Sequence, residues 1–459
     1  MTEESLTAHA RGDEDRLTCV FGLGFVGMTL AVALADGGRQ VIGIEKNAAI
    51  VEALQDGRTL FEEPGMAEVL QPILKAGRLS AMEKMPANPL ATVYIITVGT
   101  PIDENDKPRL DAIETAARDV ANVLRPNDMV ILRSTVRVGV TRNVVKPILD
   151  SAGVAYDLAF CPERTIEGKA LRELASLPQL VGGLTKKATK RAARFFSRMT
   201  PAIVELSSVE AAELAKLANN VHRDVMFAFA NEVAAAAAAH GLSGREVIDA
   251  ANKDYPRGGI CSPGPVGGPC LTKDTHILAD GLTGLGMTPA VALAAREHHD
   301  RMPGEIADDI VKLAEARGVD SGKIALLGVA FKGRPATCDM RGTVAKPIVD
   351  ALKQRLPGVE LVTWDPVVAP ADAEAELGVP AAAAPAEAVR GAAVAIIQNN
   401  HKVFASMNLD ALATTMQSNG VIYDLWAQQR GAARLKNGVD YMCFGGSGGM
   451  ARSVAAAMA

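Results

Sequence analysis

The sequence of 459 residues lacks the features that define several other classes of protein. No uninterrupted apolar run reaches the roughly 18 residues of a membrane-spanning helix, and the nearest candidate, Val233 to Ala239, is short and mostly alanine. Aromatic residues are only 4% of the chain, yet hydrophobic residues reach 48%, which is enough for packed cores. We therefore expect a globular protein without a membrane span.

Neither sign of charge is in large excess. Lysine and arginine total 48, aspartate and glutamate total 53, and the formal net charge is −5. A mildly acidic chain has no overall field that attracts nucleic acid or an anionic membrane surface. We expect no nucleic-acid or membrane partner, and any bound anion must be held by local groups.

Cysteine is sparse, and its spacing indicates no metal or disulfide site. The six cysteines include no CxxC pair, and no HExxH motif is present, so neither a disulfide framework nor a metal site is expected. The expected location is the reducing cytoplasm. Residues 1–16 are acidic and polar, lack the basic start and apolar core of a secretory signal, and are interpreted as a flexible leader.

Two parts of the chain alternate short apolar runs with helix-length segments, which is the pattern of parallel sheets built from βαβ units. In the first part the runs are Leu17–Phe21, Val41–Ile44, Val93–Val98, Met129–Leu132, Leu158–Phe160 and Ile203–Val204. In the second part they are Ile324–Gly328, Leu361–Trp364, Val394–Ile397 and Val421–Tyr423. The predicted fold class is α/β, with two Rossmann-like, doubly wound parallel sheets joined by a helical region.

In that helical region, Val209 to His240 contains no glycine or proline, is rich in helix formers and predicts one long helix. Gly241 is expected to end this helix, and Ser243 is expected to cap the next one. Residues 258–269 are crowded with glycine and proline and predict a loop. Further helices are expected over residues 272–285 and 290–301.

The segment Gly22-Leu23-Gly24-Phe25-Val26-Gly27 fits GxGxxG between the first apolar run and a helical pattern. The pyrophosphate of a dinucleotide lies against backbone N–H groups at such a helix N-terminus, where side chains would block it. Glu45 ends the second run, and its carboxylate would favour NAD over NADP, despite the neighbouring Lys46. A turn that merely reverses the chain, and FAD or S-adenosylmethionine as the ligand, are the alternatives.

Two further segments of the chain contain candidate catalytic residues. Cys270 follows a glycine-rich loop and precedes a helix with a lysine and an aspartate in its first turn, which suits a thiolate nucleophile. A buried structural thiol is the alternative. Lys216 and Asn220 are four residues apart on the long helix, so they share a face that the surrounding apolar residues turn inward. The alternative is a lysine that snorkels at the surface.

In its motifs and their order, the chain resembles the nucleotide-sugar 6-dehydrogenases, which include the UDP-glucose and UDP-N-acetylhexosamine dehydrogenases. The resemblance spans about residues 17 to 430. It is carried by GLGFVG, FEEPGM at Phe61–Met66, VGTP at Val98–Pro101, RSTV at Arg133–Val136, CPERTIEGKAL at Cys161–Leu171, AELAKLANN, GGPCLTKD, GVAFK at Gly328–Lys332 and WDP at Trp364–Pro366.

The resemblance implies a domain organisation. An NAD-binding Rossmann domain is expected over residues 17–207, a central helical dimerisation domain over 208–304 and a UDP-sugar-binding Rossmann-like domain over 318–440. A mobile tail is expected over residues 441–459. The implied cofactor is NAD, no metal is used, and the implied partners are a UDP-sugar and a second copy of the chain in a homodimer or higher oligomer.

The resemblance also implies a reaction, in which the C6 alcohol of the sugar is oxidised to a carboxylate while two NAD are reduced. Cys270 adds to the intermediate aldehyde, a thioester forms when the second hydride leaves, and water hydrolyses it. By resemblance, Lys216 is the acid/base or electrostatic partner of the alkoxide, and Asn220 donates a second hydrogen bond. Asp274 is expected to position water or tune Lys216.

Further roles follow from the same resemblance. Glu163 is the implied base for thioester hydrolysis, with Thr135 orienting a water. The implied cofactor-binding residues are Gly22, Gly24, Phe25, Val26, Gly27, Glu45, Thr100, Pro101, Ser134 and Thr135. The implied substrate-binding residues are Glu163, Arg164, Lys216, Asn220, Arg257, Gly267, Gly268, Lys332 and Arg341. Arg257 matches an arginine that can reach a neighbouring subunit's site. For Arg257, Lys332 and Arg341 alike, the alternative is a surface cation.

Some positions depart from the family pattern without removing a reacting group. Glu45, Pro269, Thr272 and Gly342 stand where aspartate, histidine, proline and serine are common. Arg164 beside Glu163 resembles the N-acetylhexosamine members, since the UDP-glucose members tend to show a Phe-Leu pair after the glutamate. The expected substrate is UDP-N-acetylglucosamine or UDP-N-acetylmannosamine, with UDP-glucose as the alternative.

Two hypotheses of a different class compete with this one. A two-electron hydroxyacid dehydrogenase shares the Rossmann-plus-helical architecture but needs neither Cys270 nor a second Rossmann-like domain. A non-catalytic dinucleotide-binding scaffold keeps the fold without turnover. The number of NADH formed per sugar separates the first from a four-electron dehydrogenase, and a Cys270→Ser variant tests the nucleophile.

Overall fold

The computed structural model describes residues 17–316, 322–429 and 434–446. The chain packs as two compact units, one formed by residues up to 219 together with 273–289, and the other by residues 220–272 together with those from 290 onward. Helices α9 (Val209–Ala239) and α11 (Leu271–Thr283) run from one unit into the other. The predicted leader over residues 1–16 lies outside the described residues.

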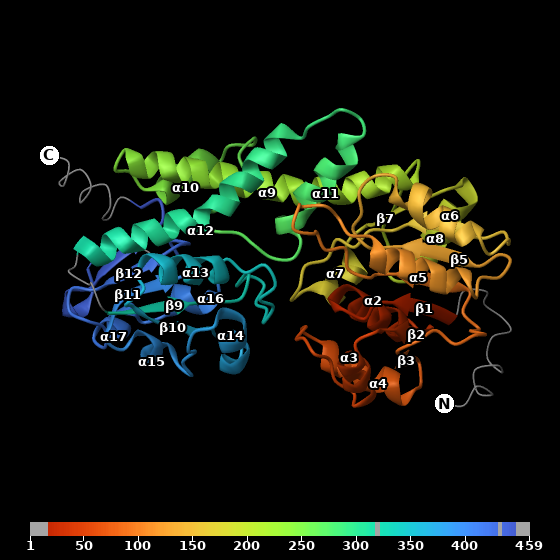
Figure 1. The fold of residues 1–459 in the computed structure, drawn as a ribbon, viewed down its shortest axis with the longest axis horizontal. Coiled ribbons are helices and arrows are strands. Elements are labelled where there is room, and N and C mark those ends of the chain that lie inside the picture. The colour runs from red at the N-terminus through yellow and green to blue at the C-terminus, as the bar shows by residue number, and fades with distance from the viewer. Residues whose placement is uncertain (1–16, 317–321, 430–433, 447–459) are drawn as a thin grey trace. The chain divides into compact units, whose positions relative to one another are not determined.

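Within the described residues, the first unit is built on an eight-stranded sheet with the order β3-β2-β1-β4-β5-β6-β7-β8 (Figure 1). Its strands are β1 (Leu17–Phe21), β2 (Gln40–Ile44), β3 (Leu79–Met82), β4 (Val93–Ile96), β5 (Met129–Leu132), β6 (Asp157–Phe160), β7 (Gln179–Gly183) and β8 (Ile203–Glu205). Every apolar run predicted here forms a strand. The sequence analysis missed β3, a partly exposed strand, and β7, which carries two glycines and pairs antiparallel with β6.

Helices cover both faces of this sheet. Along β1, Val20 packs into a core that includes Leu30 of α2, whereas Cys19 and Phe21 pack into a second core that includes Ile113 of α5. Successive strand residues point to opposite faces, so the sheet is doubly wound, as predicted. The helices are α2 (Phe25–Asp36), α3 (Ala48–Gln55), α4 (Met66–Lys75), α5 (Asp111–Ala121), the π-helix η1 (Thr141–Val145), α6 (Lys146–Asp150), α7 (Ala170–Ser176) and α8 (Lys186–Phe196).

The long helix predicted from residue 209 is confirmed as α9. It ends at Ala239, Gly241 follows with a φ of +70°, and α10 (Gly244–Asn252) begins after Ser243. The Ser243 side chain accepts a hydrogen bond from the Glu246 N–H at 3.2 Å, which is the predicted cap.

Helix α12 (Ala290–Ala316) is much longer than the predicted segment, which ended at residue 301. It continues through Pro303, although proline removes a backbone hydrogen bond. Beyond the proline, Ile306, Ile310 and Leu313 are buried in a core of the second unit. This burial stabilises the helix past the residue at which a local pattern would end it.

The second unit contains a parallel sheet with the order β10-β9-β11-β12-β13 among the described residues. Its strands are β9 (Lys323–Leu327), β10 (Glu360–Trp364), β11 (Ala392–Ile397), β12 (Val421–Asp424) and β13 (Asp440–Cys443). The helices around it are α13 (Ala345–Arg355), α14 (Pro370–Leu377), α15 (Pro385–Val389), α16 (Lys402–Ser406), α17 (Leu409–Ala413) and the short η2 (Lys436–Gly438). The four predicted strands are present.

Strand β13 corrects one prediction. The mobile tail expected from residue 441 does not begin there, because residues 441–443 pair in parallel with β12 and Tyr441 donates a hydrogen bond to Asp424 at 2.7 Å. The composition of DYMC does not exclude a strand, and its parallel pairing with β12 decides its structure. The predicted tail from residue 447 lies outside the described residues.

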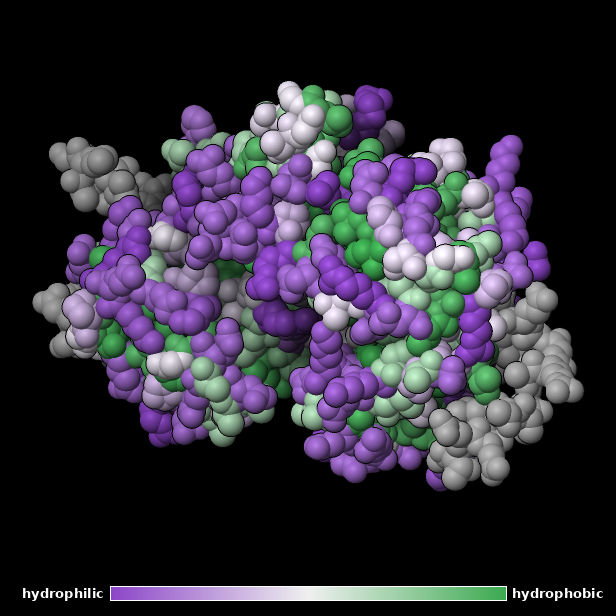
Figure 2. Space-filling model, turned by 45° about the vertical axis from the view of Figure 1, so that its right-hand side comes forward, coloured by the Kyte–Doolittle hydropathy of each residue, from purple (hydrophilic) through white to green (hydrophobic). Residues whose placement is uncertain are grey.

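Hydrophilic side chains predominate on the face of the molecule drawn in Figure 2. Across the described ranges, none of the helices combines the length and the hydropathy needed to cross a bilayer. The same ranges contain no group of three or more histidine, cysteine, aspartate or glutamate side chains placed to hold a metal ion.

Candidate active site

The glycine turn after β1 has the backbone geometry of a pyrophosphate site. Gly22 has a φ of +85°, and a Cβ on Gly27 would lie 1.8 Å from the Gly22 carbonyl oxygen, so glycine is required at both positions. Gly24 begins α2, no side chain caps this helix end, and a Cβ at Gly24 would meet open space. The N-terminus of α2 is therefore accessible to an anionic ligand.

Glu45 lies beside this turn at the end of β2. Its Oε2 accepts a hydrogen bond from the Leu23 N–H at 2.7 Å, and its Oε1 accepts one from the Asn47 N–H at 2.9 Å. Each carboxylate oxygen can accept a further bond, so the side chain is oriented for the hydroxyls of a ribose next to the glycine turn. The turn and Glu45 together fit NAD.

The turn after the first strand of the second sheet, unlike the turn after β1, is not open to a pyrophosphate. It follows β9 at Gly328, but the Asp365 Oδ2 already accepts hydrogen bonds from the N–H groups of Val329 (2.6 Å) and Ala330 (3.1 Å). A carboxylate at these amides excludes a pyrophosphate, because both would need the same donors. Asp365 belongs to the WDP motif, to which the sequence analysis assigned no role.

The remaining predicted cofactor residues lie where β4 and β5 end. Thr100 Oγ1 donates to the Thr135 carbonyl at 2.6 Å, and Ser134 Oγ donates to the Val98 carbonyl at 2.6 Å. Strand β1 lies between β2 and β4 in the sheet, so this is the point at which the strand order reverses. Ligands of doubly wound sheets bind in the crevice at such a point.

Glu213, which the sequence analysis missed, anchors the segment that follows Thr135. This buried carboxylate on α9 accepts hydrogen bonds from the Gly139 N–H (2.6 Å), the Thr141 N–H (2.8 Å) and the Thr141 hydroxyl (2.6 Å). Burial raises the pKa of Glu213, although these hydrogen bonds oppose the shift. The helix that carries Lys216 is thereby attached to the loop that carries Thr135.

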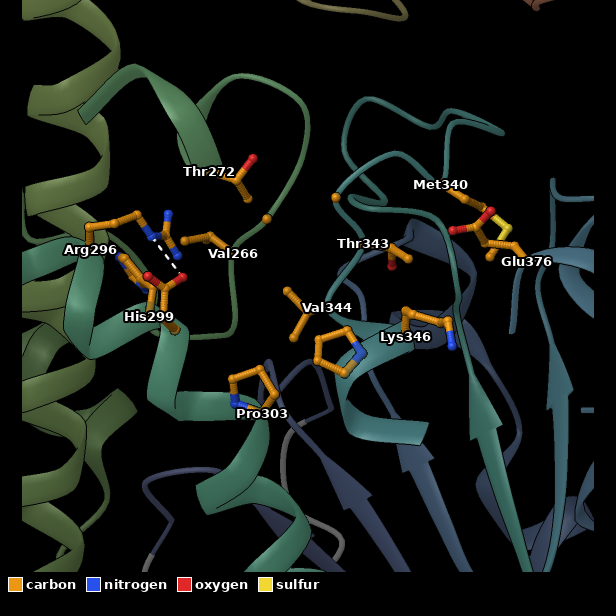
Figure 3. Close-up of a pocket in the computed structure, with 14 residues that line it drawn as sticks. Val266, Thr272, Arg296, His299, Pro303, Met340, Thr343, Val344, Lys346 and Glu376 are labelled. Atoms are coloured by element: carbon orange, nitrogen blue, oxygen red, sulfur yellow. Dashed lines mark hydrogen bonds and ion pairs between the residues drawn. The ribbon is translucent and has the colours of Figure 1, made fainter. Parts of the chain in front are cut away.

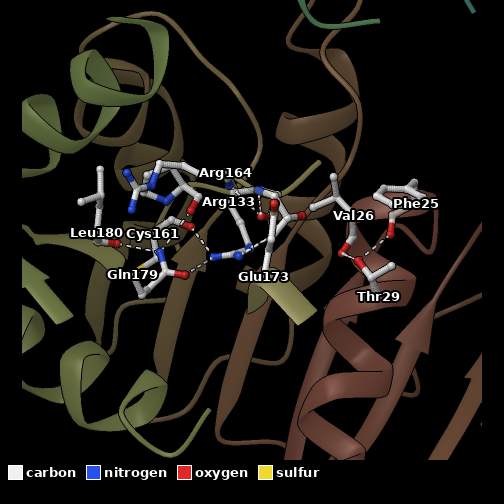
Figure 4. A network of polar contacts seen from close by, with 12 residues as sticks. Phe25, Val26, Thr29, Arg133, Cys161, Arg164, Glu173, Gln179 and Leu180 are labelled. Carbon is white, nitrogen blue, oxygen red and sulfur yellow. Dashed lines mark hydrogen bonds and ion pairs between the residues drawn. The ribbon is translucent and has the colours of Figure 1, made fainter. Parts of the chain in front are cut away.

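A buried polar network surrounds Glu163, and Figure 4 shows Arg133 and Gln179 of this network. Arg133 donates to Glu163 Oε2 from Nε (3.2 Å) and from Nη2, and its Nη1 donates to the Cys161 carbonyl and to Gln179 Oε1, both at 2.9 Å. The Glu163 Oε1 accepts the N–H groups of Arg164 and Thr165, each at 2.6 Å. Both oxygens of the predicted base are therefore engaged by N–H donors.

These donors decide the charge of Glu163. Burial opposes its ionisation, but the Arg133 guanidinium, the Thr165 N–H and, more weakly, the Lys216 ammonium outweigh burial and lower the pKa of the carboxyl. Glu163 is therefore a carboxylate near neutral pH. To accept a proton from water it must give up at least one of these hydrogen bonds, so its role as the base stays a prediction.

The face of α9 that carries Lys216 and Asn220 points inward, as predicted. Lys216 is 8% exposed and Asn220 is 9% exposed, so the alternative of a snorkelling lysine is wrong. Asp274 on α11 is almost fully buried and accepts a hydrogen bond from the Lys273 ammonium at 2.8 Å. All three side chains are thus buried, and their catalytic roles stay predictions.

Cys270 is exposed, directly before the first residue of α11. The alternative of a buried structural thiol is therefore wrong. Cys19 and Cys161 are buried, and burial raises the pKa of both thiols. Of the cysteines in the described ranges, Cys270 alone is classed as exposed, and a helix N-terminus favours its thiolate.

Apart from the buried Lys216, the predicted substrate cations are exposed or partly exposed. Arg257 is exposed, its guanidinium lies 4.7 Å from the centre of the Tyr255 ring, and its Nε donates to the Tyr255 hydroxyl at 3.1 Å. Arg341 forms a bidentate pair with Asp339, at 3.0 Å from Nε and 2.6 Å from Nη2. A substrate phosphate would have to compete with this carboxylate for Arg341.

The two units divide the predicted catalytic and substrate-binding residues. The first unit holds Thr135, Glu163, Arg164, Lys216 and Asp274. The second unit holds Asn220, Arg257, Gly267, Gly268, Cys270, Lys332 and Arg341. Along α9, Lys216 and Asn220 are about one turn apart, and Cys270 is four residues before Asp274 of α11.

Comparisons with known proteins identify the family to which the three parts of the chain correspond. The chain matches the UDP-glucose/GDP-mannose dehydrogenase family in its NAD-binding domain (residues 16–200), its central domain (210–301) and its UDP-binding domain (325–429). It is 30% identical over 410 residues to UDP-N-acetyl-D-mannosamine dehydrogenase of Pyrococcus horikoshii, covering 88% of this chain and 94% of that protein. It is 32% identical over 434 residues to NDP-N-acetyl-D-galactosaminuronic acid dehydrogenase of Ralstonia nicotianae, covering 91% and 98%.

A solved structure supports the same assignment. The UDP-D-ManNAc dehydrogenase structure from Pyrococcus horikoshii superposes with a TM-score of 0.84 at 28% identity, covering 94% of this chain and all of that chain. The glycine turn, Glu45 and the unblocked end of α2 fit the NAD of such an enzyme. The chain belongs to the UDP-glucose/GDP-mannose dehydrogenase family and is an NAD-dependent nucleotide-sugar dehydrogenase.

Proposed function

We propose that the protein oxidises the C6 alcohol of a UDP-N-acetylhexosamine to a carboxylate, with reduction of two NAD. The observation that carries this proposal is the exposed Cys270 at the start of α11, in a chain with an open dinucleotide turn. A nucleophilic thiol is needed only when the oxidation proceeds beyond the aldehyde. The names of the two relatives given above support an N-acetylhexosamine, as does Arg164 after Glu163.

Each residue has a distinct part in this sequence of steps. NAD held by the glycine turn and Glu45 would supply the hydride acceptor for each of the two oxidations at C6. Lys216 and Asn220 stabilise negative charge on the C6 oxygen as its proton leaves. The Cys270 sulfur forms a bond to the aldehyde carbon, and the resulting thiohemiacetal carries a C–H that can again leave as hydride.

Hydrolysis then releases the product. Water adds to the thioester carbon, the carbon–sulfur bond breaks, and the sulfur leaves as the Cys270 thiolate. Glu163 accepts the proton of this water after giving up one of its present hydrogen bonds, and Thr135 orients the water. Asp274 positions water or tunes Lys216. The thiol must stay reduced between turnovers, which fits the reducing cytoplasm.

The active form is a homodimer or a higher homo-oligomer in this proposal. Phe229 on α9 is 51% exposed, and Leu242 and Val247 around α10 are 52% and 36% exposed. Such apolar side chains on central helices fit an interface between copies of the chain. Arg257 lies on an exposed segment of the same unit, from which it would reach the partner's site.

The test uses the purified full chain, NAD and a panel of UDP-N-acetylmannosamine, UDP-N-acetylglucosamine, UDP-N-acetylgalactosamine and UDP-glucose. Near-ultraviolet absorbance of reduced nicotinamide should show two NADH for each N-acetylhexosamine consumed. A preference for UDP-glucose would identify UDP-glucose, and not a UDP-N-acetylhexosamine, as the substrate. One NADH per sugar would indicate a two-electron dehydrogenase, and NAD binding without turnover of any sugar would indicate a scaffold.

A further inference from the structure

Arg296 of α12 is tied to the backbone next to the nucleophile. Its guanidinium is 3% exposed, and Nη1 donates to the Leu271 carbonyl at 3.2 Å and to the Asp224 carboxylate at 3.0 Å. The Nε donates to the Asp300 carboxylate at 3.0 Å. Leu271 directly follows Cys270, so this guanidinium holds the chain one residue beyond the thiol.

A second attachment holds the chain before the thiol. The Gly268 N–H donates to the Gly342 carbonyl at 2.8 Å, and Gly268 has a φ of +97°. The Thr272 hydroxyl donates back to the Gly268 carbonyl at 2.9 Å. Cys270 therefore lies between two fixed points, Gly268 and Leu271, and the side chain of Arg296 supplies one of them.

The segment from Val266 to Thr272 also borders a cavity. A cavity of about 390 Å³ is lined by Val266, Gly267 and Thr272 of this segment, by Arg296 and His299 of α12, and by residues 342–344 (Figure 3). A Cβ on Gly267 would lie 2.2 Å from the Gly342 carbonyl oxygen, so close backbone packing also holds the loop here, and the hydrogen bonds of Gly268 and Leu271 fix its direction.

The burial of the charges also requires an explanation. Asp224 is fully buried, and removing it and Arg296 from water costs desolvation that a well-packed apolar pair would avoid. What the guanidinium provides, and an apolar side chain could not, is a directed bond to the Leu271 carbonyl. Its planar set of donors reaches Asp224, Asp300 and Leu271 at the same time.

We propose that Arg296 is a positioning residue that fixes the Cys270 thiol at the start of α11 through the Leu271 carbonyl. This inference rests on the proposed function of Cys270 as the nucleophile. The position matters because a reacting atom displaced by about 1 Å can slow an enzyme by about a hundredfold. The N-terminus of α11 also favours the thiolate only while the sulfur stays beside it.

The first test is Arg296→Lys in the full-length protein. The ammonium can still neutralise Asp224 but cannot reach all three acceptors, so kcat should fall between about tenfold and a hundredfold. The KM values for NAD and the UDP-sugar should stay within about twofold. The matched control is Arg301→Lys on the same helix, where an exposed arginine pairs with Glu297 and Glu305, and it should leave kcat unchanged.

A second measurement, the alkylation rate of Cys270, does not require the sugar substrate. Iodoacetamide alkylation of Cys270, followed by mass spectrometry of its peptide, should slow by about two- to fivefold in Arg296→Lys, because the thiol loses the field of the helix terminus. Unchanged kcat and unchanged alkylation would overturn the positioning role. If Cys270→Ser still oxidised the sugar to the acid, the proposed function would fail instead, while the alkylation result would still report on the position of the thiol.

A milder variant covers the case in which Arg296→Lys does not fold. Asp300 has 59% of its side chain exposed, so Asp300→Asn loosens the guanidinium without emptying the core. It should lower kcat by about threefold or more in the same direction, with KM values unchanged, because one of three anchors is weakened. Wild-type kcat and wild-type alkylation in a folded Asp300→Asn protein would then overturn the proposal.

Discussion

The guanidinium of Arg133 and the carboxylate of Glu163 form a buried ion pair where β5 and β6 end. The side chains are 1% and 9% exposed. Arg133 also binds the Cys161 carbonyl and Gln179, so a single cation holds the segment that begins with CPER. This pair keeps the predicted hydrolytic base ionised and oriented.

Replacing Arg133 by methionine should destabilise the protein strongly. The Glu163 charge would stay buried without its cation, and breaking such a pair costs about 3–5 kcal/mol in free energy of unfolding. Urea denaturation measures this loss. Arg58→Met removes an arginine from an exposed pair with Asp56 and should have almost no effect. Equal losses of unfolding free energy in Arg133→Met and Arg58→Met would mean that burial of the Arg133 pair adds nothing to stability.

The same pair predicts how stability depends on pH. The pKa of Glu163 is lowered from its usual 4.5 in the folded state, so the unfolded chain takes up this proton first as the pH falls. The stabilisation is complete above pH 4.5 and is lost below it, as the pH passes through the folded-state pKa. Thermal unfolding of Glu163→Gln should therefore vary less with pH below 4.5 than that of the wild type. If the thermal unfolding of Glu163→Gln and of the wild type varied equally with pH in acid, the lowered pKa of Glu163 would not contribute to stability.

Two glycine variants should separate cofactor binding from folding. A Cβ on Gly24 meets open space at the start of α2, so Gly24→Ala should fold normally but weaken NAD binding by about tenfold, since the methyl group obstructs the pyrophosphate. A Cβ on Gly27 would clash with the Gly22 carbonyl, so Gly27→Ala should lose stability as well. NAD titration and thermal unfolding measure the two effects. Unchanged NAD affinity in Gly24→Ala would place the cofactor elsewhere.

Cys270→Ser should abolish formation of the acid while NAD affinity is retained. A serine hydroxyl is a far weaker nucleophile at neutral pH, so the thioester cannot form. Product analysis by mass spectrometry and NAD titration measure the two properties. Cys261→Ser is the matched control, because burial raises the pKa of that thiol and it should carry no step. Continued formation of the acid in Cys270→Ser would contradict the mechanism.

Local sequence patterns predicted the features that depend on neighbouring residues. The strands β1 and β5 have the predicted bounds, and α9 begins at the predicted residue, since continuous apolar or helix-forming segments specify them locally. The glycine turn and the Ser243 cap follow from backbone geometry within a few residues. Strands β3, β7 and β13 escaped prediction because pairing with distant strands, rather than composition, stabilises them.

In the candidate active site, too, some features follow from local sequence and others depend on distant residues. Inward-facing Lys216 and the thiol before α11 could be inferred from spacing along the chain. The partners that anchor their surroundings could not, because Glu213 binds Thr141 across 72 residues and Asp365 binds Val329 across 36. Glu213 lies in the AELAKLANN motif and Asp365 in the WDP motif, but no local pattern there indicates which distant backbone groups each carboxylate binds.

The sequence by itself determined the fold class, the dinucleotide turn and the inward face of α9 that carries Lys216, since each rests on short-range patterns of burial and glycine. Only the tertiary structure decided that the second turn is closed by Asp365, that Glu163 is held by Arg133 and that Arg296 supports the segment after Cys270. The physical reason is that hydrogen bonds and ion pairs gain their strength from burial, and burial depends on which distant segments fold together.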